Sequence, residues 1–189
     1  MKRRVTTTHL EMVSPEAFKP AANYETRAEI RKVANDSLLA FSLFVGVGLP
    51  WQWYSRLEWT PADWDRHFAE TETVMYLAFS GEPLIGYFEL EFQAEGNAEI
   101  KFLGLLPPHV GRGLGGALLS HAVAQAWREP TRRVWLHTCD LDAPAALGNY
   151  RARGFTVFDQ VTEIEDIPES DAFAEAIGRF HLAYAERCV

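Results

Sequence analysis

The chain has 189 residues, of which 48% are hydrophobic and 13% aromatic. This length suits one domain, and the apolar content is high enough to fill a core and to argue against disorder. The formal net charge is −8, from 18 basic and 26 acidic residues, and nucleic-acid-binding proteins usually have basic surfaces instead. We therefore expect a single domain over residues 1–189 that binds no nucleic acid.

The sequence offers no sign of secretion, membrane insertion or metal binding. No apolar stretch follows the basic start at residues 1–9, so we expect no signal peptide. The most apolar run, 38–51, contains glycines and a proline and is shorter than the roughly 20 residues that span a membrane. The two cysteines, Cys139 and Cys188, lack the spacing of metal ligands or of a disulfide framework. We expect a cytoplasmic protein without a metal.

In the first part of the chain we expect one strand and two helices. Residues 5–13 read as a strand, and residues 24–44 have helical composition up to the glycines that follow. Thr60 and Pro61 are typical of a helix start, so a second helix is expected to reach about Glu70.

From residue 74 onward the period changes to that of strands. Residues 74–79, 84–92 and 98–106 are expected strands, separated by short polar turns, which is typical of an antiparallel meander. The remaining expected elements are a helix at 113–127, a strand at 134–138, a helix at 144–153, a strand at 155–164 and a helical tail from 170 to 184. A strand–helix–strand connection over 98–138 implies a right-handed parallel crossover. The fold class is α/β with a mixed sheet, in the order β-α-α-β-β-β-α-β-α-β plus the tail.

The most informative segment is the glycine-rich turn His109–Gly116, which lies between a predicted strand and a predicted helix. The first amides of a helix have no partner within the helix, and the helix dipole adds positive potential there. Glycines remove the side chains that would block a close approach to these amides. Together these features predict a cradle for a diphosphate, with Arg112 supplying a nearby positive charge.

The same turn also satisfies the dinucleotide-binding pattern G-x-G-x-x-G, over Gly111–Gly116. A dinucleotide fold, however, places this turn after the first strand of a parallel sheet, with an acid about 20 residues later. Here the turn follows an antiparallel meander, and the region around Arg132 and Arg133 provides no such acid. A nucleotide-dependent oxidoreductase is therefore kept only as the last of the hypotheses for this chain.

Two motifs carry a resemblance to a known family. Residues 98–107 (AEIKFLGLLP), followed by residues 111–115 (GRGLG), resemble motif A of the GNAT superfamily of N-acetyltransferases. Residues 150–155 (YRARGF) look like the second helix-to-strand motif of that superfamily, and the order of elements matches over roughly residues 70–160. One departure is Val110, which stands where the family often has Arg or Gln.

The resemblance implies a GNAT-like fold with a splayed central pair of parallel strands, in which acetyl-CoA lies as co-substrate. It implies transfer of the acetyl group to a primary amine by direct attack in a ternary complex. The backbone of Leu105 and Leu106 would hold the pantetheine arm, and one of their amides would polarise the thioester carbonyl. The residues implied to bind the cofactor are Leu105, Leu106, Gly111, Arg112, Gly113, Leu114, Gly115 and Gly116.

The catalytic residues implied by the resemblance are Tyr150 and Glu99. A phenol at position 150 could donate a proton to the departing thiolate, or it could simply pack on the sheet. Glu99 could remove a proton from the amine, or it could be a solvated acid; Glu89 and Glu91 are reserves for the same role. Many members of the superfamily use no dedicated base.

Other polar residues near the predicted strand end are less specific. His137, at the end of the predicted strand 134–138, is more often a structural residue than a catalytic one. Asp142 is expected to cap the helix that follows. Cys139 has no evident activating partner, so a covalent acetyl-cysteine is not expected.

Aromatic side chains are dense before the second predicted helix. We take Trp51, Trp53 and Tyr54 as walls of an acceptor pocket, with core packing as the alternative for the whole group, which also includes Trp59 and Trp64.

The acceptor is expected to be a small-molecule or peptide amine, and pairing into a homodimer through the C-terminal segment stays open. The alternative from another class is a non-catalytic acyl-CoA-binding or regulatory module.

Overall fold

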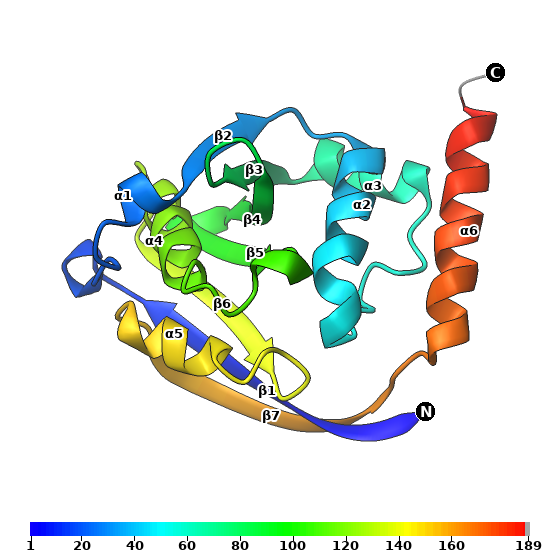
Figure 1. Cartoon of the computed structure of the whole chain (residues 1–189). Helices are drawn as coiled ribbons and strands as arrows, with labels where there is room; N and C mark the ends of the chain where they lie inside the picture. The colour runs from blue at the N-terminus through cyan, green and yellow to red at the C-terminus, as the bar shows by residue number, and fades with distance from the viewer. Residues whose placement is uncertain (188–189) are drawn as a thin grey trace.

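Seven strands form one mixed sheet in the computed structural model, which describes residues 1–187 (Figure 1). Cys188 therefore lies outside the described residues. The strands are β1 (Lys2–Met12), β2 (Glu29–Val33), β3 (Glu72–Phe79), β4 (Leu84–Gln93), β5 (Asn97–Leu105), β6 (Arg133–Cys139) and β7 (Thr156–Asp166). Their order across the sheet is β2-β3-β4-β5-β6-β1-β7. Only the β5–β6 pair is parallel among the described strands, as the crossover predicted.

Helices cover both faces of this sheet. They are α1 (Tyr24–Arg27), α2 (Ser37–Gly48), α3 (Pro61–Glu70), α4 (Gly115–Ala126), α5 (Ala146–Ala152) and α6 (Ser170–Glu186). Apolar residues of α4 and α5 pack with one face, while those of α2, α3 and α6 form a second core on the other face. In Figure 1, α6 lies outside α2. Within residues 1–187, no helix is both long enough and apolar enough to cross a bilayer.

The expected α/β class, the antiparallel meander and the C-terminal helix are all confirmed. The capping of α3 is also as expected: Thr60 accepts from the backbone of Asp63, whose carboxylate accepts from the backbone of Thr60. The helix expected over 24–44 is wrong in its middle, because the chain forms α1, then β2, then α2. The β-branched Ile30 and Val33 pair with Ala78 and Met75 of β3, so sheet pairing overrides the helical composition of this short segment.

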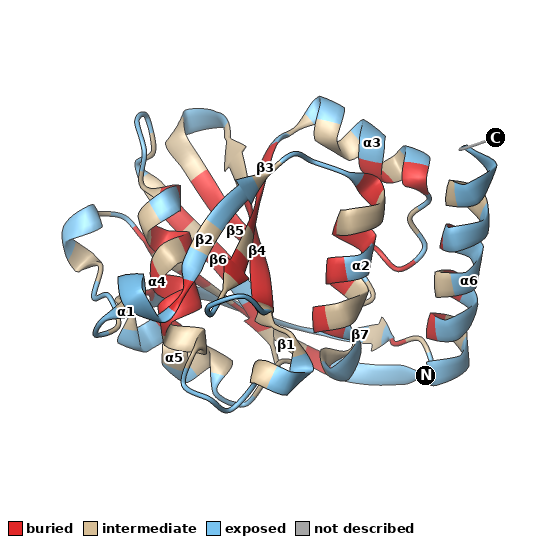
Figure 2. Ribbon diagram, turned by 45° about the horizontal axis from the view of Figure 1, so that its top comes forward, coloured by how far each residue is buried: buried red, intermediate tan, exposed pale blue. Residues whose placement is uncertain are grey.

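Strand β1 lies between β6 and β7 and is antiparallel to both. Leu10 faces Leu136 of β6 and Val157 of β7, and its side chain is fully buried. The N-terminal strand is therefore an interior strand of the sheet, whereas β7 at the edge is exposed along nearly all its length (Figure 2). The half of the sheet that contains β6 depends on β1 for its packing.

We predict that Leu10→Ala lowers the free energy of unfolding by about 2–5 kcal/mol, because it leaves a cavity under an interior strand. Leu182→Ala is the matched control, since Leu182 is 70% exposed on α6, and it should change stability by less than about 0.5 kcal/mol. Urea unfolding measures both. Equal effects for the two variants would contradict an interior role for β1.

Candidate active site

The central feature of the site is a split in the sheet between β5 and β6. Their parallel pairing runs from Asn97–Arg133 to Glu99–Trp135 and ends there, although both strands continue. Lys101 is an extra residue on β5, because Glu89 pairs with Phe102 and the next residue of β4 pairs with Ile100. Such a bulge bends its strand and increases the local twist. The bulge lies just where β5 leaves β6.

A cavity of about 590 Å³ occupies this split. Its walls come from the diverging ends of β5 and β6, the glycine-rich turn, α5, and the segment that follows α2. A second hollow of about 410 Å³ adjoins it and shares Thr7, Lys101 and His137 with it. Two spaces therefore meet at the point where the strands separate.

The glycine-rich turn forms part of the cavity wall. Gly111 and Gly113 have φ of +79° and +70°, a backbone region that favours glycine. Both line the cavity, together with Gly115 and Gly116 at the start of α4. Within residues 1–187, the N-cap residue Leu114 gives α4 no side-chain hydrogen bond. The first amides of the helix are thus available to an anion.

Arginines surround the turn. The guanidinium of Arg27, from α1, donates to the carbonyl of Arg112 at 3.4 Å. Arg153 lies so close to Gly116 that a Cβ there would be 2.7 Å from its Nη1. The contributions of Arg27 and Arg153 were missed from the sequence, because these residues lie far from the turn in the chain and reach it only through the fold. They add positive potential to that of Arg112.

The backbone of β5 offers one of the two expected amides to the split. The amide of Leu106 donates to Ile85 of β4 at 2.9 Å, and its carbonyl accepts from the amide of His109 at 2.9 Å. Successive amides of a strand alternate in direction, so that of Leu105 is directed away from β4, toward the split. Leu105 lines the cavity. The amide of Leu106 is therefore already engaged by β4, whereas a role for its carbonyl stays a prediction.

Tyr150 lines the same cavity from α5, with only 9% of its surface exposed. Burial, and secondly the carboxylate of Asp142, raise the pKa of Tyr150 well above that of a free phenol. The hydroxyl therefore keeps its proton and can serve as a donor. Asp142 does not cap α5, whose N-cap is Ala145. Instead, Asp142 accepts from Thr138 Oγ1 at 2.6 Å and from Trp53 Nε1 at 3.1 Å.

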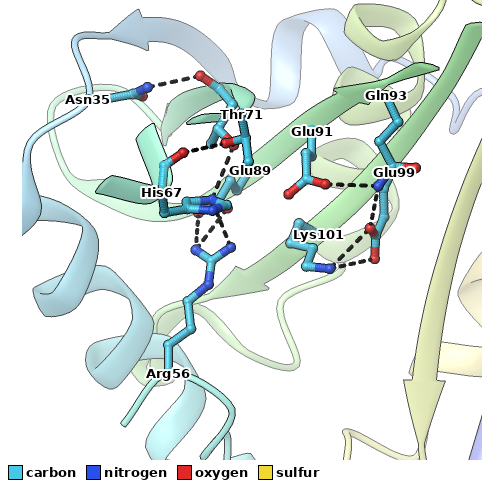
Figure 3. A network of polar contacts seen from close by, with 10 residues as sticks. Asn35, Arg56, His67, Thr71, Glu89, Glu91, Gln93, Glu99 and Lys101 are labelled. Atoms are coloured by element: carbon cyan, nitrogen blue, oxygen red, sulfur yellow. Dashed lines mark hydrogen bonds and ion pairs between the residues drawn. The ribbon is translucent and has the colours of Figure 1, made fainter. Parts of the chain in front are cut away.

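Glu99 lies beneath the second hollow, with its side chain 1% exposed. Its carboxylate accepts from Gln93 Nε2 at 3.0 Å and from Lys101 Nζ at 3.1 Å (Figure 3). His137 Nδ1 lies 3.3 Å from Glu99 Oε1. Burial alone would raise the pKa of Glu99, but His137 and Lys101 outweigh it and hold that pKa below its usual value. Glu99 is thus an ionised carboxylate. It does not line the large cavity itself, but its partners Lys101 and His137 do.

The two reserve carboxylates have other partners. Glu89 is buried and ion-paired with Arg56, whose Nη1 lies 2.9 Å from its Oε1 and 3.1 Å from its Oε2. His67 lies against the same pair, with its Nε2 3.0 Å from Arg56 Nη2 (Figure 3). Glu91 accepts from Gln93 at 2.9 Å. Neither Glu89 nor Glu91 lines either hollow, so they are poorly placed as bases.

Some of the aromatic residues between 51 and 64 line the cavity, and the others pack in the core. Trp51, Trp53 and Tyr54 line the cavity. Trp59 and Trp64 instead pack on the guanidinium of Arg56, whose Cζ lies 4.5 and 4.9 Å from their ring centroids. The first three form a wall, and the other two belong to the core behind it.

Tyr54 shares the cavity with Glu165 of β7. Both residues line it. Burial, and secondly Glu165, raise the pKa of Tyr54 to about 12, so the phenol is neutral. Cys139 is also in this wall, and burial, followed by Asp142, raises the pKa of its thiol. A thiol rather than a thiolate agrees with the expectation that no acetyl-cysteine forms.

Comparison with known proteins agrees with this geometry. Residues 33–155, more than half of the chain, match the Acetyltransferase (GNAT) family. No curated protein sequence matches the chain. A solved GCN5-related N-acetyltransferase from Sphaerobacter thermophilus is 18% identical with a TM-score of 0.60, over 89% of this chain and 54% of that one. Another from Kribbella flavida is 19% identical with a TM-score of 0.56, over 87% and 59%.

At these identities the likeness to the solved structures concerns the fold. The chain spans between about half and two thirds of the length of such structures. The family match covers the meander, the glycine-rich turn, α4, β6 and α5, and so includes most of the residues that line the cavity. The chain belongs to the GNAT family of acetyltransferases.

Proposed function

We propose that this protein transfers an acetyl group from acetyl-CoA to a primary amine, by direct attack in a ternary complex. The observation that carries the proposal is that one cavity contains both the uncapped start of α4 and the free edge of β5. A CoA thioester needs an anion site and a backbone edge at the two ends of an extended arm. The start of α4 and the edge of β5 support the proposal because they could supply these two parts.

The turn and α4 would hold the diphosphate. Gly111, Gly113, Gly115 and Gly116 line the cavity, and the helix dipole favours negative charge there. Arg112 would add a mobile positive charge, with Leu114 contributing only backbone. The grip would be made mostly by the main chain, so that Val110 in place of a polar residue has little effect.

The edge of β5 would hold the pantetheine arm and the thioester. The amide of Leu105 is directed into the split, where a backbone-like arm could pair with β5 in place of β6. A donor at this position could also stabilise the negative charge that develops on the thioester oxygen during attack. Removal of such a donor in other enzymes costs about 10²–10³-fold in kcat.

Tyr150 would donate to the departing sulfur. Its raised pKa keeps the hydroxyl protonated at neutral pH, and it lines the cavity from the α5 side. As the C–S bond breaks, charge develops on sulfur, and a neutral phenol can donate to it. The acceptor, a small-molecule or peptide amine, would lie against the wall formed by Trp51, Trp53 and Tyr54.

The first test measures whether the protein binds CoA and whether it transfers acetyl. We expect CoA to raise the melting temperature while NAD does not, because only a ligand of the native state stabilises it. With acetyl-CoA and a panel of primary amines (putrescine, tyramine and lysine amide), we expect release of free thiol. CoA binding without thiol release from any amine would favour the non-catalytic acyl-CoA-binding module instead.

A variant of the glycine-rich turn tests the proposed diphosphate cradle. Gly115→Asp should abolish CoA binding in calorimetry, because it places a carboxylate where the diphosphate would lie. The fold should persist: a Cβ at Gly115 meets only Asn149 Nδ2 at 3.8 Å, and an acid at a helix start is favourable. Gly115→Ala is the control and should keep most of the affinity. Gly113 is less suitable, since its φ of +70° would strain any side chain. Unaltered CoA affinity in Gly115→Asp would refute this cradle.

A variant of Tyr150 tests its proposed role as the proton donor to sulfur. Tyr150→Phe keeps the ring that packs beside Phe155 and removes the hydroxyl. We expect kcat to fall by about 10²-fold, which is typical for loss of a general acid, while CoA affinity stays the same. Steady-state kinetics with an accepted amine, together with calorimetry, measure both. A kcat equal to that of the wild type would remove Tyr150 from the mechanism.

A further inference from the structure

We infer that His137, oriented by Glu99, is the group that takes the proton from the acceptor amine. The inference rests on the proposed function and assigns a role that this function leaves open. It depends on three features of the structure: the close approach of His137 Nδ1 to Glu99, the place of His137 in the split sheet, and its position on the opposite face from Tyr150.

The pair has the geometry of an oriented base. His137 Nδ1 lies 3.3 Å from a Glu99 carboxylate that is ionised and 1% exposed. An ionised carboxylate accepts a hydrogen bond, so Nδ1 carries the hydrogen and the lone pair of the neutral ring lies on Nε2. Within residues 1–187, Nε2 has no hydrogen-bonding partner, and the side chain is 41% exposed. Glu99 is enclosed, whereas the free nitrogen of His137 is accessible.

The position of His137 is where the two hollows meet. On β6 it stands two residues beyond Trp135, the last residue paired with β5, and so within the split. It lines both the cavity that would hold the thioester and the second hollow. An amine that lies against the wall of the large cavity would therefore have His137 in the same cavity as the thioester.

Alternation along β6 separates the proposed base from the proposed acid. Val134, Leu136 and Thr138 are buried, and the first two belong to the core formed with α4 and α5. His137 points to the other face, while Tyr150 approaches the cavity from α5. His137 would therefore approach the amine from one face of the sheet, and Tyr150 would approach the thioester sulfur from the other. This arrangement suits a direct attack of the amine on the thioester.

The proton balance is as follows. His137 Nε2 takes one proton from the ammonium, and the neutral nitrogen forms a bond to the thioester carbon. The tetrahedral intermediate then loses a second proton from nitrogen, and the C–S bond breaks with its electron pair on sulfur, which receives a proton from Tyr150. The second proton restores the phenol, and His137 releases the first to solvent. The products are an amide, CoA thiol and one proton.

Several ionisable groups surround this imidazole. Lys101, from β5, shares the Glu99 carboxylate at 3.1 Å and so offsets part of its charge. The ring of His9, from β1, lies near it in a tilted arrangement, with centroids 6.0 Å apart. Glu163 of β7 lines the same hollow. The pH dependence of catalysis should therefore respond to Glu99 and not to His137 alone.

The test compares His137→Gln with wild type, using an amine that the wild type accepts. We expect kcat/KM to fall by about 10²-fold near neutral pH, with CoA affinity in calorimetry unchanged. The deficit should shrink as the pH rises toward values at which the amine is itself neutral. His181→Gln, an exposed histidine on α6, is the control and should match wild type. A deficit that stays constant with pH, or no deficit, would overturn the inference.

A structural role for Glu99 is separated from a positioning role by two further measurements. Glu99→Gln should displace the acid limb of the pH–rate profile, and Glu99→Asp should restore part of the rate. In long-range ¹H–¹⁵N NMR spectra of the CoA complex, His137 should carry its proton on Nδ1. A proton on Nε2 would refute the inference even if no amine in the panel is accepted. Lack of CoA binding would instead refute the proposed function.

Discussion

The loss of pairing between β5 and β6 beyond Glu99–Trp135 is the constraint on which the site depends. Backbone N–H and C=O groups of a buried strand need hydrogen-bonding partners. Where β5 separates from β6, the edge of β5 that faced β6 has no strand to pair with. The bulge at Lys101 bends β5 at this place. Because α4 begins next to the end of β5, the same opening brings the free strand edge and the helix amides into one cavity.

The two faces of the split sheet present different chemistry. On the α5 side, a buried Tyr150 keeps its proton, since burial and Asp142 both disfavour the phenolate. On the other side, a buried Glu99 stays charged, since His137 and Lys101 compensate for its burial. Burial raises the pKa of both groups, but Asp142 adds to this effect at Tyr150, whereas His137 and Lys101 outweigh it at Glu99.

A buried ion pair supports the wall of the cavity. Arg56 pairs with Glu89 and contacts the rings of Trp59, Trp64 and Phe102. Buried charges are costly unless paired, and removing one partner is far more damaging than the pair is stabilising. This network attaches the segment after α2 to β4 and β5. The neighbouring aromatic residues that line the cavity are thereby held over the split.

Local sequence determined the class of fold, the meander, the glycine-rich turn and the cap of α3, because hydrophobic period, glycine and capping residues act over a few positions. It did not determine that β1 lies inside the sheet, nor that β2 is a strand, since both depend on partners distant in the chain. Likewise, the pairing of His137 with Glu99 and the engagement of Leu106 by β4 were decided by strand register. Register follows from how whole strands bury their faces, and only the tertiary structure settles it.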